Sequence, residues 1–147
     1  MDDRIFAKPQ DQIVDFAFNE DVVGVFPDMI RRSVPGYELV IPMGGLIAAR
    51  HMGTSGTAFD LGCSLGASSL ALLAQCESPS VRLIAVDNSE AMIEQARHNI
   101  DDARVSFRCA DLLATDVSGA NVVMLNFVLQ FLPPQARAQL LGTIAAT

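Results

Sequence analysis

The stretch that decides the fold is FDLGCSLGASSL, residues 59–70. An apolar run over residues 57–61 leads into Gly62, and a run rich in alanine and leucine follows Gly66. The first run is typical of a buried strand and the second of a helix, so the two glycines are expected in the tight turn between them. A strand–turn–helix of this kind presents backbone N–H groups and the start of a helix to a ligand.

Strands and helices are predicted to alternate from residue 57 onward. The further strands are expected over residues 81–87, 104–111 and 121–127, and the helices over 66–76, 89–100 and 133–146. Ser89 is a suitable N-cap for the second of these helices. The alternation predicts right-handed β–α–β crossovers, and therefore an α/β, Rossmann-like fold with a mostly parallel sheet and flanking helices.

The residues before this core predict an N-terminal helical extension. We expect residues 1–56 to form a lead-in and cap, and residues 57–147 the ligand-binding core, within one structural domain. The extension is expected to contain a mobile lead-in (1–18), a helix kinked at Pro27 (19–33), a turn (33–37) and a helix with Pro42 near its first turn (40–51).

Composition narrows the classes of function. Half of the 147 residues are hydrophobic, which fits a sheet buried on both faces. The 17 acidic residues outnumber the 10 basic ones, and the net charge of −7 argues against direct binding of nucleic acid. The first residues lack a secretory pattern, and the uncharged run 117–136 carries asparagines and two prolines. We therefore expect a cytoplasmic protein without a membrane partner.

The cysteines predict neither a disulfide framework nor a metal site. Cys63, Cys76 and Cys109 are odd in number and contain no C-x-x-C pair. We expect them to be reduced thiols that pack as small apolar groups, and we assign no metal to the protein.

Polar residues recur at the carboxyl end of each predicted strand. In chain order they are Asp60, Gly62 and Ser64, then Asp87 and Asn88, then Asp111, then Asn126. Because the carboxyl ends of parallel strands meet at one edge of a sheet, these residues are expected to surround one crevice. In that place Asp87 would accept hydrogen bonds from ribose hydroxyls, and Asp111 from an adenine amino group.

The details favour one adenosine ligand over others. The G-x-G-x-x-G fingerprint is not met, because Ser64 stands in place of its second glycine. Asp87 follows Gly62 by 25 residues, where a nicotinamide site has about 20. A phosphate-binding P-loop is absent from the sequence. S-adenosyl-L-methionine, which carries adenosine but no pyrophosphate, fits the pattern better.

Longer blocks of sequence carry a resemblance to known families. DLGCSLG, AVDNSEAMIEQAR, CADL and VVMLNFVLQFL look like the strand-end motifs of the class I methyltransferase-like fold. FNEDVVGVFPDMIRRSVPGYELVI resembles the N-terminal segment of carboxy-S-adenosyl-L-methionine synthases, bacterial enzymes of tRNA wobble-uridine (cmo5U) modification. The resemblance runs from about Phe16 to Leu141, and its specific blocks are VFPDMI, SVPGY and LGCSLG.

The resemblance implies a reaction and partners. Such enzymes are transferases that convert S-adenosyl-L-methionine and prephenate into carboxy-S-adenosyl-L-methionine and phenylpyruvate. The sulfonium methyl group loses a proton, and the resulting ylide captures the CO2 that prephenate releases. A homodimer is implied, and a separate enzyme then modifies the tRNA.

The resemblance also implies a set of ligand-binding residues. The motifs place them at Tyr37 (in the turn), Gly62, Cys63, Ser64, Asp87, Asn88, Asp111, Leu112 and Asn126. No catalytic residue is assigned, because the family arginine that pairs with the added carboxylate lies in a C-terminal half without counterpart in this sequence. The sequence also stops without a fifth strand, so we expect a truncated domain.

Two other interpretations stay open on the residues alone. An ordinary S-adenosyl-L-methionine-dependent methyltransferase would satisfy the strand-end motifs, and a non-catalytic binding or dimerisation module would satisfy the short, apolar sequence. Arg31 and Arg32 could meet an anionic substrate, but adjacent helical residues point in different directions, and we expect a solvated face. Cys63 is expected to be present for its size, not as a nucleophile.

Overall fold

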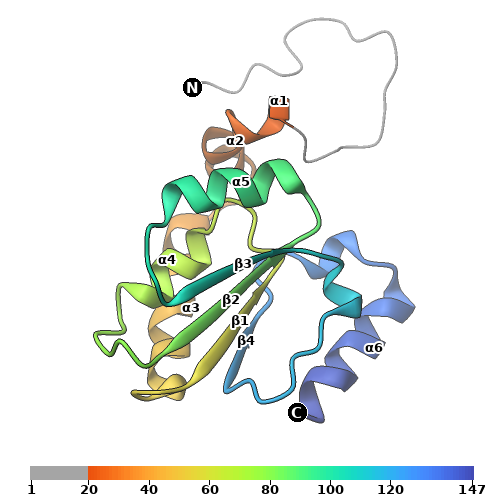
Figure 1. The fold of residues 1–147 in the computed structure, drawn as a ribbon. Coiled ribbons are helices and arrows are strands. Elements are labelled where there is room, and N and C mark those ends of the chain that lie inside the picture. Colours follow the sequence, from red (N-terminus) through yellow and green to blue (C-terminus); the bar gives the residue numbers. More distant parts are fainter. Residues whose placement is uncertain (1–19) are drawn as a thin grey trace, which may run out of the picture.

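The computed structural model describes residues 20–147, and the predicted lead-in over residues 1–18 lies outside them. The described chain forms a parallel sheet with helices on both faces (Figure 1). Its four strands are β1 (Thr57–Leu61), β2 (Arg82–Asp87), β3 (Val105–Cys109) and β4 (Val122–Met124). The strand order is β3-β2-β1-β4, and every neighbouring pair is parallel. The predicted α/β fold class is thereby confirmed.

The chain reverses its direction across the sheet next to β1. It steps from β1 to β2 and β3 on one side, and then returns to place β4 on the other side of β1. The crossovers contain α4 (Ala67–Leu73) and α5 (Glu90–Asn99). Ligands of open α/β sheets bind beyond the carboxyl ends of the strands at such a switch point, here between β1 and β4.

The two faces of the sheet are covered by different helices (Figure 1). Along β1, Ala58 packs toward α3 (Tyr37–Met52) and α4, whereas Phe59 and Leu61 pack toward α6 (Pro134–Ala145). This alternation follows from the two-residue period of a strand. The central strands β1 and β2 are buried on both faces and are largely apolar, in agreement with the apolar composition, whereas β3 is partly exposed and alternates apolar with polar residues.

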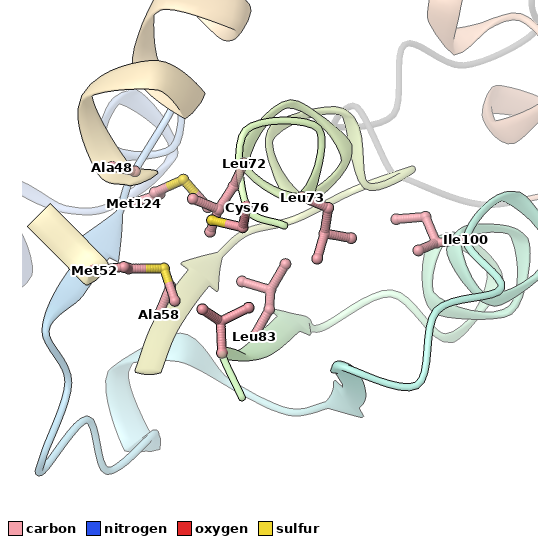
Figure 2. Close-up of a cluster of buried hydrophobic side chains, with 10 residues drawn as sticks. Ala48, Met52, Ala58, Leu72, Leu73, Cys76, Leu83, Ile100 and Met124 are labelled. Carbon is pink, nitrogen blue, oxygen red and sulfur yellow. The ribbon is translucent and has the colours of Figure 1, made fainter. Parts of the chain in front are cut away.

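The larger apolar cluster lies between the sheet and α3 and α4 (Figure 2). Leu72 and Leu83 are each 1% exposed in it, and such burial stabilises the fold by about 1.5–3 kcal/mol per side chain. The buried Cys76 packs in the same cluster as a small apolar group, as predicted, whereas the prediction is wrong for Cys109, which is exposed. The remaining members are Ala48, Met52, Ala58, Leu73, Val81, Ile100 and Met124.

The predicted break in the N-terminal helix is present, but it lies at a different position from the predicted one, Pro27. The helical stretch divides into α1 (Glu20–Val23) and α2 (Phe26–Ser33), so the break comes before Pro27. Pro27 instead lies in the first turn of α2, where a missing N–H group costs nothing. Helix α3 begins three residues earlier than predicted, directly after Gly36, and Pro42 therefore lies inside the helix.

The boundary error closest to the site concerns β4, which ends three residues earlier than predicted. The strand has three residues where seven were predicted, and the chain then curls through η2 (Leu129–Phe131) before α6. Phe127 has a φ of 58°, a left-handed conformation that cannot continue a strand. The other core elements agree within three residues, and Ser89 caps α5 as predicted, its Oγ accepting from Met92 N at 3.3 Å. Within residues 20–147, no helix has the length and apolarity required to cross a membrane.

Candidate ligand-binding site

Hydrogen bonds to β2 hold the turn between β1 and α4. The backbone N–H groups of Gly62 and Cys63 both donate to Val86 O, at 2.8 and 2.9 Å. Gly62 has a φ of 76°, and a Cβ atom there would stand 2.5 Å from Val128 Cγ2. Gly66 has a φ of 86°, and its Cβ would stand 2.5 Å from Ile100 Cδ1. Both positions therefore require glycine, as the sequence of the turn predicted.

Asp87 ties the end of β2 to the same turn. Its Oδ2 accepts from Ser64 N at 2.9 Å, and its Oδ1 accepts from Ser89 N at 3.0 Å. Ser64 has a φ of 49°, so the first of these bonds supports a left-handed residue. Each carboxylate oxygen has a second lone pair, and Asp87 can still accept hydrogen bonds from a bound ligand.

A cavity of about 210 Å³ opens at the carboxyl ends of the strands. All four strand ends contribute to its lining, and so does the first turn of α3. The nine residues predicted to bind ligand all line it: Tyr37, Gly62, Cys63, Ser64, Asp87, Asn88, Asp111, Leu112 and Asn126. The residues predicted to surround one crevice therefore do so, with the exception of Asp60.

Three placements differ from those predicted. Asp60 lies within β1, is 1% exposed and is absent from the cavity lining, whereas the sequence placed it after the strand. Tyr37 is the first residue of α3, not a turn residue, because Gly36 ends the turn. Asn126 lies two residues beyond the shortened β4. Asp111 caps η1 (Leu112–Ala114), since its Oδ1 accepts from Leu113 N at 2.8 Å.

Burial changes the acidity of the groups at the base of the site. It raises the pKa of Asp60 to about 6, although the hydrogen bond from Ser69 Oγ, at 2.7 Å, opposes the rise. Burial and then the charge of Asp60 raise the pKa of Tyr37. Burial also raises the pKa of the Cys63 thiol, which therefore stays protonated and is a poor nucleophile.

Two lining residues, Phe127 and Ser68, were not predicted from the sequence, and each contacts a residue that was. Tyr37 and Phe127 lie with ring centroids 5.5 Å apart, and both line the cavity. Ser68 also lines it and accepts a hydrogen bond from Asn126. An apolar pattern after β4 predicts burial but not the left-handed residue that turns Phe127 toward Tyr37. The further lining residues are Phe26, Ile30, Ile41, Ala67, Val128, Phe131 and Leu132.

A second cavity of about 330 Å³ adjoins the first, between α2, the start of α3 and the β1–α4 turn. Arg31 lines it, and Arg31 Nε lies 2.9 Å from Glu38 Oε1. Arg32 Nη1 instead lies 3.2 Å from Asp28 Oδ2, outside both cavity linings. The two arginine side chains are 64% and 65% exposed, so the predicted solvated face is confirmed, with Arg31 at the edge of a cavity.

The charges around the first cavity favour a cationic ligand. Asp87 and Asp111 line it, and the charge of the buried Asp60 acts on two lining residues, because burial and then this charge raise the pKa of Tyr37 and of Cys63. Among the described residues that line this cavity, none carries a positive charge. Apolar side chains also line the cavity and lower its dielectric constant. The attraction between these carboxylates and a positive charge is therefore stronger there than in water.

Comparison with known sequences identifies the family to which the chain belongs. The profile described as "Methyltransferase domain" matches residues 58–147. The chain belongs to the methyltransferase-domain family. Curated relatives named carboxy-S-adenosyl-L-methionine synthase are 48% identical, from Trichlorobacter lovleyi over 98% of this chain and from Marinobacter nauticus over 97%. The chain spans 61% and 58% of their lengths, and they confirm the resemblance found in the sequence.

Solved structures of methyltransferases share the fold. Magnesium protoporphyrin IX methyltransferase from Synechocystis, solved with bound S-adenosyl-L-methionine, matches with a TM-score of 0.62 at 17% identity. That match covers 90% of this chain and 74% of the other. A candidate S-adenosyl-L-methionine-dependent methyltransferase from Methanococcus maripaludis matches with a TM-score of 0.68 at 23% identity, over 90% and 60% of the two chains. At these identities the likeness concerns the fold.

Proposed function

We propose that the protein binds S-adenosyl-L-methionine in the first cavity and serves in its conversion to carboxy-S-adenosyl-L-methionine. The observation that carries the proposal is that residues from all four strand ends line one cavity. The names of the curated relatives support the reaction, and the acidic lining suits a ligand whose sulfonium and ammonium groups are positive.

The arrangement of the lining suggests how the ligand would lie. Asp87 would accept from the ribose hydroxyls, because its carboxylate stands at the middle of the row of strand ends. Asp111 and Leu112, beyond β3, would flank the adenine. The β1–α4 turn, Tyr37 and Asn126 would then surround the methionyl end of the ligand.

The second cavity would receive the other reactant, prephenate. It shares Tyr37, Cys63 and Ser64 with the first cavity, so a molecule there would approach the methionyl end. Its walls are largely apolar, and Arg31 is the basic residue among the described residues that line it. An exposed ion pair contributes little free energy, so a ligand carboxylate could replace Glu38 as the partner of Arg31 at small cost.

The proposal extends to the partners of the protein. We propose a homodimer in the cytoplasm, and the exposed Leu39, Met43 and Ile47 along α3 support burial of that face against another subunit. The net charge of −7 supports a role that stops short of contact with tRNA, which a separate enzyme would then modify.

Mass spectrometry tests the reaction. The protein is incubated with S-adenosyl-L-methionine, with and without prephenate, and we expect a nucleoside heavier by one CO2 together with phenylpyruvate only when both are present. Calorimetry with S-adenosyl-L-methionine alone tests the binding step separately. Binding without any prephenate-dependent product would overturn the synthase proposal for this chain and keep the binding proposal.

The family match also supports an ordinary methyltransferase as the second candidate. Release of S-adenosylhomocysteine with one member of a panel of small-molecule and RNA acceptors would favour it. Consumption of prephenate with no S-adenosylhomocysteine would exclude it. Absence of binding to any adenosyl ligand would favour a structural or dimerisation module.

A further inference from the structure

Two adjacent serines in the first turn of α4 connect this helix to two different strands. Ser69 Oγ donates to Asp60 Oδ2, within β1, at 2.7 Å. Ser68 Oγ accepts from Asn126 Nδ2, just beyond β4, at 2.9 Å. Ser68 is 6% exposed, and its hydrogen bond to Asn126 lies part-buried at the wall of the first cavity.

The bond to Ser68 fixes which edge of the Asn126 amide a ligand can meet. An amide carries its two donor hydrogens on nitrogen and its acceptor pairs on oxygen. Because Nδ2 is directed at Ser68, the oxygen lies on another edge of the planar group. Gly44 of α3 packs beside the amide, where a Cβ would be 3.7 Å from Nδ2 and 3.9 Å from Oδ1. Asn126 and Ser68 both line the first cavity, so the amide is held between α3, α4 and that cavity.

We propose that Ser68 is a positioning residue that orients Asn126 so that Oδ1 accepts a hydrogen bond from the α-ammonium group of the ligand. This inference rests on the proposed binding of S-adenosyl-L-methionine and deepens it. The charges around the cavity agree, because Asp87 and Asp111 line it and favour an ammonium group over a carboxylate there.

Calorimetry with paired ligands tests the inference without requiring turnover. S-adenosylhomocysteine carries the amino-acid group, and 5′-methylthioadenosine lacks it. Ser68→Ala is expected to weaken S-adenosylhomocysteine binding about 3- to 10-fold, the worth of one positioned hydrogen bond, and to leave 5′-methylthioadenosine binding within about 2-fold. Ser68→Thr, which keeps the hydroxyl group, is expected to restore the affinity.

Two further comparisons separate positioning from damage to the fold. Asn126→Ala is expected to show the same ligand dependence as Ser68→Ala, and the double variant is expected to lose no more than either single variant, because both act through one amide. Ser78→Ala removes another serine hydroxyl, one that donates to Thr54 O away from both cavity linings, and is expected to change neither affinity.

Analogues of S-adenosylhomocysteine identify the group that Asn126 contacts. The effect of Ser68→Ala is expected to persist with the decarboxylated analogue and to disappear with the analogue that lacks the amino group. The reverse pattern would mean that Asn126 donates to the carboxylate, and equal losses for all ligands would mean a general structural role; either result overturns the inference. Failure of the unsubstituted protein to bind any of these ligands would instead refute the proposed function on which the inference rests.

Discussion

Two segments that meet at the cavity are held in opposite ways. The β1–α4 turn, residues 62–66, follows a strand with a parallel neighbour on each side and is fixed through its backbone N–H groups, by two bonds to Val86 O and one to Asp87 Oδ2. The β4–α6 segment, residues 125–133, follows a three-residue strand at the edge of the described sheet. Side chains hold it, through the Asn126–Ser68 bond and the contact of Phe127 with Tyr37.

The comparison shows why the path of the chain could be predicted from sequence in one segment and not in the other, although Asn126 of the second was predicted. A turn that requires glycine at fixed positions has a local sequence signal. That signal marked the end of the preceding strand, and the strand was predicted to the residue, at Thr57–Leu61. A segment held by contacts 58 or 90 residues away in the chain, as from Asn126 to Ser68 and from Phe127 to Tyr37, has no local signature. The two segments touch where Gly62 meets Val128.

The largest loss of stability is expected from a substitution at Gly62, where the two segments touch. Gly62→Ala adds a methyl group at 2.5 Å from Val128 and forces alanine into a left-handed conformation. We expect a loss of about 2–4 kcal/mol in the free energy of unfolding, from strain and overpacking together. Urea denaturation measures it.

A second glycine with the same φ serves as the control that separates backbone strain from overpacking. Gly119 has the same φ of 76°, and a Cβ added there would meet no atom within 4 Å, so Gly119→Ala carries strain alone, about 1–2 kcal/mol. Val128→Ala in the Gly62→Ala background should recover part of the loss. Equal losses at both glycines, with no recovery, would mean that the contact between the segments contributes nothing.

The next largest effect on stability is expected from Asp60, because its carboxyl is buried within β1, where it accepts a hydrogen bond from Ser69 of α4. Burial raises its pKa from 3.8 to about 6, so the unfolded state loses the proton at a lower pH than the folded state. Its contribution to stability is complete below pH 3.8 and is lost as the pH rises to about 6, by on the order of 3 kcal/mol.

The substitution Asp60→Asn isolates this titration. Asparagine keeps an oxygen that can accept from Ser69 Oγ and carries no proton to lose. The difference in unfolding free energy between wild type and variant should therefore move in favour of the variant between pH 4 and pH 6. A difference that stays constant over this range would show that Asp60 does not titrate above its ordinary pKa.

The aromatic contact that holds the β4–α6 segment should show a smaller effect. A double-mutant cycle with Tyr37→Leu and Phe127→Leu is expected to give a coupling of about 0.5–1.5 kcal/mol in the free energy of unfolding. Pairing Tyr37→Leu with Leu113→Ala, an exposed side chain in η1, should give additive losses. Additivity in both pairs would mean that the rings are neighbours without mutual stabilisation.

The smallest changes in stability are expected at the exposed arginines. Arg31→Gln and Arg32→Gln should each change the free energy of unfolding by less than about 1 kcal/mol, because exposed ion pairs contribute little. The two variants should differ in function, since only Arg31 lines the second cavity. We expect weaker prephenate binding by calorimetry for Arg31→Gln alone; equal behaviour of the two would remove the second cavity from the proposal.

Much of the fold and of the site lining could be predicted, for a physical reason. In a parallel sheet, every carboxyl end lies at one edge, so polar residues after four apolar runs had to converge, and Asn126 was predicted even though β4 is shorter. Prediction failed where tertiary contacts decide. Asp60 reads as a strand-end carboxylate, yet the hydroxyl group of Ser69 allows it to be buried inside β1. The α2 residues Phe26 and Ile30 reach the cavity only through packing between helices.

Calorimetric titration with S-adenosyl-L-methionine tests the central claim most directly, with Asp87→Ala compared against Asp116→Ala. Both aspartates accept backbone N–H bonds from their own turns, Asp87 from Ser89 and Asp116 from Ser118, but Asp87 lines the first cavity and Asp116 does not. We predict one binding site in the wild type, a loss of about 1–3 kcal/mol in binding free energy for Asp87→Ala, and wild-type affinity for Asp116→Ala. No binding by the wild type, or equal affinity of all three proteins, would contradict a nucleoside site at the strand ends.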